Sequence, residues 1–180
     1  MWTAIAIVAV ILLYFVSVYN GLIARKTQTR EAWATVDTQL KRRYDLIPNL
    51  VNTVKGATKH ESKTLEAVIS ARNSAISATG AEGKAVAENQ LTGALKSIFA
   101  LAESYPTLRA NENFLDLQRE LTDTETKIQA ARQFYNTVVM GLNTAVQQFP
   151  TNLIANMFKI GTEKFFEIAE SEKTAPKVEF

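Results

Sequence analysis

The sequence contains no cysteine, a single histidine and few residues that break helices. Without cysteine, the chain has no disulfide, no thiolate nucleophile and no cysteine metal site, which says little about its compartment. His60 is the only histidine, so a zinc site would need carboxylates for its other protein ligands. Seven glycines and four prolines in 180 residues favour long helices over a many-turned sheet. With 47 % hydrophobic and 21 % charged residues, the composition is that of a globular protein.

Motifs for nucleotide binding and for catalysis are also missing. Neither G-x-x-x-x-G-K-[ST] nor G-x-G-x-x-G occurs. His60-Glu61 is not the start of a zinc-protease helix, because Thr64 stands where the second histidine would be, and a surface turn is expected instead. The net charge is only +2, and no cationic face is interleaved with aromatic residues, so we expect no nucleic-acid binding. We therefore expect no enzyme, no cofactor and no metal.

Charge is absent from Met1–Ala24, which is strongly apolar. From Trp2 to Tyr19 a helix would cover about 25 Å, close to the thickness of the hydrocarbon layer, with an aromatic residue at each end. A cleaved signal peptide would carry basic residues before this run and small residues at a cleavage site after it. A buried core helix is the other alternative. The sequence favours a transmembrane helix that contacts lipid through residues 2–20.

Three basic residues, Arg25, Lys26 and Arg30, follow this apolar run directly. The positive-inside tendency then predicts that the C-terminal domain is cytoplasmic, with an extracytoplasmic domain as the alternative. These cations also lie where they would attract anionic lipid headgroups, although setting the topology suffices to explain them.

The remainder has the spacing of long helices. Apolar positions separated alternately by three and four residues continue the first helix to about Lys59. Further helices are predicted at Ser62–Ser77, at Glu88–Ser104 and from Asn113, as N-cap, to Phe149. The two seams of alternating spacing are Trp33, Val36, Leu40, Arg43, Ile47, Leu50, Val54 and Phe114, Leu117, Leu121, Thr124, Ile128, Ala131, Tyr135, Val138, Leu142, Ala145, Phe149.

The predicted fold is all-α: an up-and-down antiparallel four-helix bundle on an N-terminal transmembrane helix. Ala78–Glu88, with two glycines, is predicted to be a loop. A shorter amphipathic helix is expected within residues 152–170, whose apolar side chains either pack on the bundle or form a patch for a partner or a membrane surface. The domain division is 1–24 for the anchor, 25–170 for the bundle and 171–180 for a flexible tail.

The stretch LKRRYDLIPNL, residues 40–50, places a charge inside an apolar seam. Arg43 occupies a seam position, and Asp45 lies off its helical face, so an acid from another helix is the better partner. Glu103, Glu120 and Glu125 are the candidates. Pro48 has no N–H, and its ring crowds the carbonyl of Tyr44, so a kink is expected there.

Five charged residues form a candidate polar cluster between helices. A buried ion-pair network that fixes helix register is the structural interpretation, and a cavity that binds a small anion or a lipid headgroup is the functional one. The cluster consists of Arg43, Arg72, Glu103, Glu125 and Arg132.

Several segments resemble the LemA family. They are RRYDLIPNLVNTVKG (42–56), HES and TLEAVISAR within 60–72, AESYPTLRANENFLDLQREL (102–121), TETKIQAARQFYN (124–136) and FPTNLIANMF (149–158). The resemblance implies a bacterial membrane protein with one N-terminal membrane helix and an up-and-down helical bundle. It implies no reaction, because the family has no established general activity. Links of some members to magnetosome formation or to membrane zinc proteases do not transfer to these residues.

From these observations we expect a non-enzymatic adaptor, scaffold or assembly factor in the bacterial cell membrane. Protein partners are expected, and a second copy of the chain is one candidate. The main alternative is a binding module for a small anionic ligand or lipid headgroup in the polar cluster. A hydrolase using His60 or Glu125 and a self-assembling structural protein are further alternatives.

Overall fold

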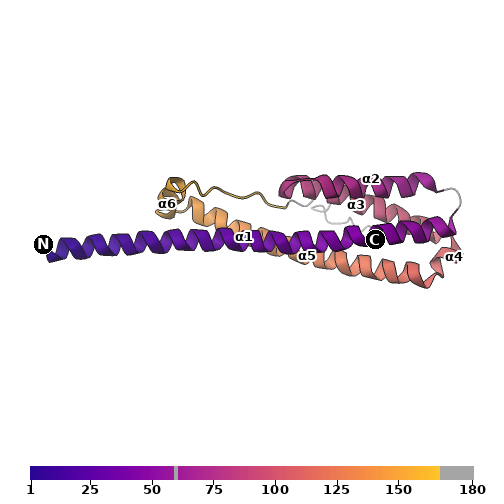
Figure 1. Ribbon diagram of the computed structural model, residues 1–180, viewed down its shortest axis with the longest axis horizontal. Coiled ribbons are helices and arrows are strands. Elements are labelled where there is room, and N and C mark those ends of the chain that lie inside the picture. The colour runs from indigo at the N-terminus through magenta and orange to yellow at the C-terminus, as the bar shows by residue number, and fades with distance from the viewer. Residues whose placement is uncertain (59–60, 167–180) are drawn as a thin grey trace, which may run out of the picture. The chain divides into compact units, whose positions relative to one another are not determined.

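Helices are the only regular secondary structure in the part of the chain that the computed structural model describes, residues 1–58 and 61–166. The predicted all-α class is confirmed at this level. In chain order (Figure 1) the helices are α1 (Trp2–Ala57), α2 (Ser62–Ser77), α3 (Gly80–Glu103), α4 (Pro106–Arg109), α5 (Glu112–Gln147) and α6 (Thr151–Met157).

Helix α1 is a single helix of 56 residues, as the spacing predicted. Six of its seven seam residues are buried: Val36, Leu40, Arg43, Ile47, Leu50 and Val54 are at most 4 % exposed. The beginning of the helix is different, because Trp2, Leu13 and their neighbours are mostly exposed. By length and composition α1 could cross a membrane, and none of the residues in its most apolar stretch is buried.

The predicted N-termini of two helices are wrong. Residues 78–88 are not a loop, because α3 begins at Gly80, whose φ of 72° only glycine adopts readily. Buried alanines in this segment, such as Ala81 and Ala85, favour helix and permit close packing against α2, which lies alongside α3 in Figure 1. Helix α5 is capped by Asn111 rather than Asn113, since Asn111 Oδ1 accepts a 3.1 Å hydrogen bond from the Phe114 N–H.

The C-terminal part departs further from the prediction. Apart from the half-buried Leu117, the seam of α5 is buried as far as Leu142, but Phe149 is 80 % exposed and lies beyond the helix. Of the described residues between 152 and 166, those up to Met157 are helical and those after it form no helix. Ile154 and Ile160 are buried, as packing on the fold requires. Ile168 and the predicted tail, 171–180, lie outside the described residues.

The chain forms two compact units, to which α1 and α5 both contribute. Among the described residues, the first unit comprises 1–36 and 131–165, and the second comprises 37–130 together with Phe166. In the first unit α1 and α5 run antiparallel, because Arg25 bonds the Gly141 carbonyl and the Trp33 ring contacts the Tyr135 ring. The predicted division into 1–24 and 25–170 stays a prediction.

Candidate functional site

The second unit contains a charge deep in its interior. Arg43 is 4 % exposed in the seam of α1. Its Nη1 atom lies 3.1 Å from Glu88 Oε2 on α3 and 3.0 Å from Glu125 Oε2 on α5. Its Nη2 donates a 2.8 Å hydrogen bond to Thr92 Oγ1. One guanidinium therefore connects three helices, and the expected pairing with an acid from another helix is confirmed for Glu125.

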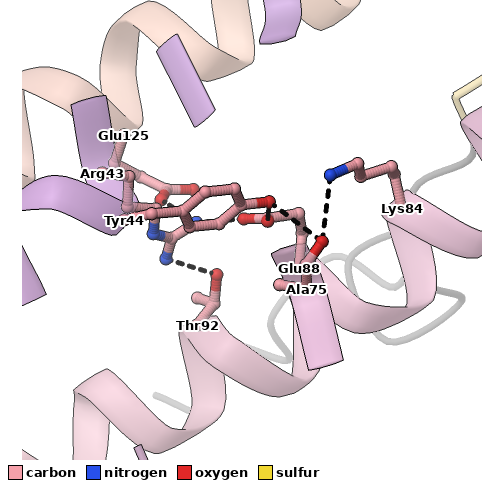
Figure 2. A network of polar contacts seen from close by, with 7 residues as sticks. All are labelled: Arg43, Tyr44, Ala75, Lys84, Glu88, Thr92 and Glu125. Carbon is pink, nitrogen blue, oxygen red and sulfur yellow. Dashed lines mark hydrogen bonds and ion pairs between the residues drawn. The ribbon is translucent and has the colours of Figure 1, made fainter. Parts of the chain in front are cut away.

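Tyr44 extends this network toward α2 (Figure 2). Its hydroxyl donates a short hydrogen bond to Glu88 Oε1 and also lies 3.3 Å from the Ala75 carbonyl oxygen. Glu88, which is 2 % exposed, thus receives a neutral donor on one carboxylate oxygen and a cation on the other. Two polar partners of this kind are what a buried carboxylate requires.

Lys84 completes the network at the C-terminal end of α2. Its Nζ donates to the carbonyls of Ala75 and Ile76, at 3.0 and 3.5 Å. It also lies 5.5 Å from the centroid of the Tyr44 ring, within the range of a cation–π interaction. A cation at the last turn of a helix satisfies carbonyls that have no intrahelical partner and complements the helix dipole.

Burial dominates the electrostatics of the network. It raises the pKa of Glu88 above the ordinary value of 4.5, although the Tyr44 hydroxyl and the charges of Arg43 and Lys84 act in the opposite direction. Burial, followed by the Glu88 hydrogen bond and charge, also raises the pKa of Tyr44. The phenol is therefore a hydrogen-bond donor, not an anion, at neutral pH.

Pro48 leaves a backbone acceptor that the tertiary structure satisfies. Within the helix, the Tyr44 carbonyl would accept from the N–H of residue 48, which proline lacks. Arg72 Nε on α2 donates a 2.8 Å hydrogen bond to this same carbonyl. Helix α1 accordingly continues through Pro48. The kink expected at Pro48 stays a prediction.

Beside Arg43 the second unit has a cavity of about 370 Å³. Leu95 and Phe99 form part of an apolar wall, while Lys96 and Glu125 contribute opposite charges. Its full lining is Arg43, Thr92, Leu95, Lys96, Phe99, Leu121, Thr122, Glu125, Thr126 and Gln129. The cavity thus combines apolar surface with hydroxyl groups and a guanidinium that is already paired.

The structure brings together only some members of the predicted cluster. Arg43 and Glu125 form an ion pair, and Arg72 reaches the same part of α1 through the Tyr44 carbonyl. Glu103 is exposed at the C-terminal end of α3. Arg132 belongs to the first unit. His60 lies outside the described residues, whereas Glu61 accepts a 2.9 Å hydrogen bond from the Tyr105 hydroxyl.

Sequence reasoning missed Glu88 and Lys84. Both lie in the segment interpreted as a loop because of its glycines. A signal was nevertheless present: Lys84, Glu88, Leu91, Leu95, Ile98 and Ala102 follow one another at spacings of four and three residues. Continuing the α3 seam toward the N-terminus would have identified Glu88 and Lys84 as interior positions. In the described part of the chain, no three His, Asp or Glu side chains lie close enough to hold a metal ion.

The Pro48–Arg72 arrangement can be tested with a double-mutant cycle. Arg72→Ala leaves the Tyr44 carbonyl without its donor and should lower the unfolding free energy by about 1–2 kcal/mol. In a Pro48→Ala background the backbone N–H is restored, so the same change should cost about 1 kcal/mol less. Urea unfolding of the full chain, followed by circular dichroism, measures both. The matched control is Arg42→Ala, whose exposed pair with Asp123 should show no coupling to Pro48. Equal costs of Arg72→Ala in both backgrounds would contradict this account.

The raised pKa of Glu88 predicts a pH-dependent stability difference. The folded state binds this proton more tightly than the unfolded state, so Glu88 contributes less stability as the pH rises above about 4.5. Glu88→Gln cannot titrate. Its cost relative to the natural chain should therefore be larger at pH 5 than at pH 7.5, as measured by urea unfolding.

Tyr44→Phe provides the second variant, because it removes a hydrogen bond that lowers the pKa of Glu88. In the Tyr44→Phe background, the pH range over which the cost of Glu88→Gln changes should therefore extend to higher pH. A cost of Glu88→Gln that increases with pH would show instead that the attraction of Arg43 outweighs burial.

Comparison with known proteins agrees with the resemblance. The model of the LemA family matches residues 32–180, which include the whole Arg43 network. The chain is also 25 % identical over 167 residues to Protein LemA of Metamycoplasma hominis, covering 89 % of this chain and 74 % of that protein. Because the family model covers well over half of the sequence, the chain belongs to the LemA family.

Proposed function

We propose that this LemA-family chain is a single-pass membrane protein of the bacterial cell membrane that acts as a non-enzymatic adaptor, scaffold or assembly factor. Family membership assigns no reaction to it. The proposal combines an apolar helix available to lipid with a helical domain whose interior charges are engaged with one another. The basic residues after the apolar run favour a cytoplasmic location of the domain, with the opposite orientation as the alternative.

The beginning of α1 is the observation that carries the proposal. Residues 2–20 contain no charge, and large apolar side chains in this stretch are exposed, with Trp2 at 85 % and Leu13 at 70 %. A helix of this length extends about 27 Å, close to the hydrocarbon thickness of a bilayer. So much apolar surface on a helix without charges is unfavourable in water and favourable in lipid.

Within the second unit we propose a four-helix bundle formed by α1, α2, α3 and α5. Arg43 links α1 to α3 and α5, and Arg72 links α2 to α1. Because Arg43 and Glu88 already have their partners, the network supports register and rigidity rather than proton transfer. Exposed apolar residues on the outer side of α2, Ile69 and Ile76, are candidate contacts for a protein partner.

Membrane anchoring predicts how the full chain behaves with vesicles. The natural chain should float with phospholipid vesicles and resist extraction by alkaline carbonate. Val8→Asp combined with Leu12→Asp places two charges in the hydrocarbon layer, at roughly 2.5–3.5 kcal/mol each, and should abolish both properties.

The matched control introduces the same two charges elsewhere. Ile69→Asp with Ile76→Asp also replaces exposed apolar residues but should leave flotation unchanged. Flotation that survives the changes at positions 8 and 12 would contradict the anchor.

A second function, binding of a small anion or lipid headgroup, is favoured by the cavity beside Arg43. Its lining offers the Lys96 ammonium, threonine hydroxyls and an apolar wall that would suit an acyl chain. The Glu125 carboxylate already occupies the place beside the Arg43 guanidinium where an anion would bind, and the Glu125 side chain is 30 % exposed. A bound anion would therefore compete with this carboxylate.

This competition gives the binding hypothesis a sharp test. Dihexanoyl phosphatidic acid should raise the melting temperature of the purified full chain in a saturable way, and by more in Glu125→Gln, since the competing charge is gone. The shift should decrease in Lys96→Gln. Glu66→Gln, on α2 and outside the cavity lining, is the control. Equal shifts in melting temperature for the natural chain and all three variants, or no shift in any of them, would contradict binding in the cavity.

A further inference from the structure

One end of the first unit has no charged side chain. Charges are missing from residues 1–24 and again from residues 133–158, which include the end of α5 and all of α6. Arg25, whose Nη1 donates a 3.3 Å hydrogen bond to the Gly141 carbonyl, is the first charged residue of α1 after its uncharged stretch. Two segments that are far apart in sequence thus build one charge-free region.

Helix α6 is apolar on two sides. Its inner side, Ile154 and Ala155, is buried with Leu22 of α1 and Leu142 of α5 in one core cluster. Its outer side is exposed, with Leu153 at 58 % and Met157 at 66 %, and Phe149 just before the helix is 80 % exposed. Packing on the fold explains the first set but not the second.

Contacts with α1 fix the depth of α6 relative to the apolar run. The Phe158 ring lies 4.4 Å from the Tyr19 ring and 5.9 Å from the Phe15 ring, measured between centroids. Phe15 and Tyr19 both belong to residues 2–20, the uncharged stretch through which α1 is proposed to contact lipid. This stretch extends about 27 Å, close to the thickness of the hydrocarbon layer. Helix α6 therefore packs against a part of α1 that lies within the layer or at its edge.

We propose that α6 and the preceding Phe149 form a second membrane contact, with Phe149, Leu153 and Met157 among the lipid acyl chains at the interface. The inference rests on the proposed anchoring through α1. The occupant of this surface is lipid, because the surface is continuous with the exposed apolar part of α1 and has no charge. Its polar neighbour Asn156 is exposed and carries an uncharged amide suited to the headgroup boundary. Lys159, two residues after the end of α6, is also exposed, and its ammonium would reach headgroup phosphates.

The absence of native cysteine allows a direct test on the full chain. Single cysteines are introduced by Phe149→Cys, Leu153→Cys and Met157→Cys, labelled with a nitroxide and reconstituted in phosphatidylcholine and phosphatidylglycerol vesicles. Val8→Cys reports on the anchor itself, and Ile69→Cys reports on the exposed surface of the second unit. Electron paramagnetic resonance then compares collisions with oxygen, which partitions into lipid, and with a water-soluble nickel chelate.

We expect oxygen collisions to dominate at position 8 and at the α6 positions, and nickel collisions to dominate at position 69. Lipid exposure at position 8 together with nickel accessibility at positions 149, 153 and 157 would overturn the inference and keep the anchor. Protection of these three positions from both reagents would also overturn it, by showing that protein covers them. Nickel accessibility at position 8 would overturn the anchor and the inference together. Three independent positions keep the test decisive if one variant fails to fold.

Discussion

A single buried guanidinium organises the second unit. Arg43 holds carboxylates from α3 and α5 and a hydroxyl from α3, while the adjacent Tyr44 bonds Glu88 and lies close to the end of α2. Removing one partner of a buried pair generally costs about 3–5 kcal/mol, because the other charge stays desolvated. A helix that slips by one residue would separate these groups. The network therefore selects one register among the many that interchangeable leucines and alanines would allow.

Sequence reasoning succeeded where a periodic pattern decides the outcome. The seam of α1 is buried from Val36 to Val54, and Arg43 occupies the interior position that the spacing assigned to it. Identifying its partners was harder, since the side of α3 that faces α1 depends on tertiary packing. The two glycines near Ala81 led to the prediction of a loop, although Lys84 and Glu88 continue the spacing of the α3 seam. Local turn chemistry and long-range periodicity conflicted there, and periodicity prevailed.

The prediction for the end of α5 was wrong for a different reason. Phe149 continues the 3,4 spacing, so the sequence placed it in the core, yet the helix stops at Gln147 and the ring is exposed. Period alone does not reveal that a segment has left the surface against which its seam packs. The charge-free stretch from Gln133 to Phe158 was visible in the sequence all along. Its significance emerges only when α6 is seen to pack against Leu22.

The bond from Arg72 to the Tyr44 carbonyl has a consequence for the mechanics of α1. An isolated helix would be weakest at its proline, because one rung of its hydrogen-bond ladder is missing there. Here the missing rung is supplied from α2, so the bending stiffness of α1 around Pro48 depends on the attachment of its neighbour. If α2 detached, α1 would lose this hydrogen bond and would bend more easily at Pro48. A partner that displaced α2 would therefore change the flexibility of α1 at this point.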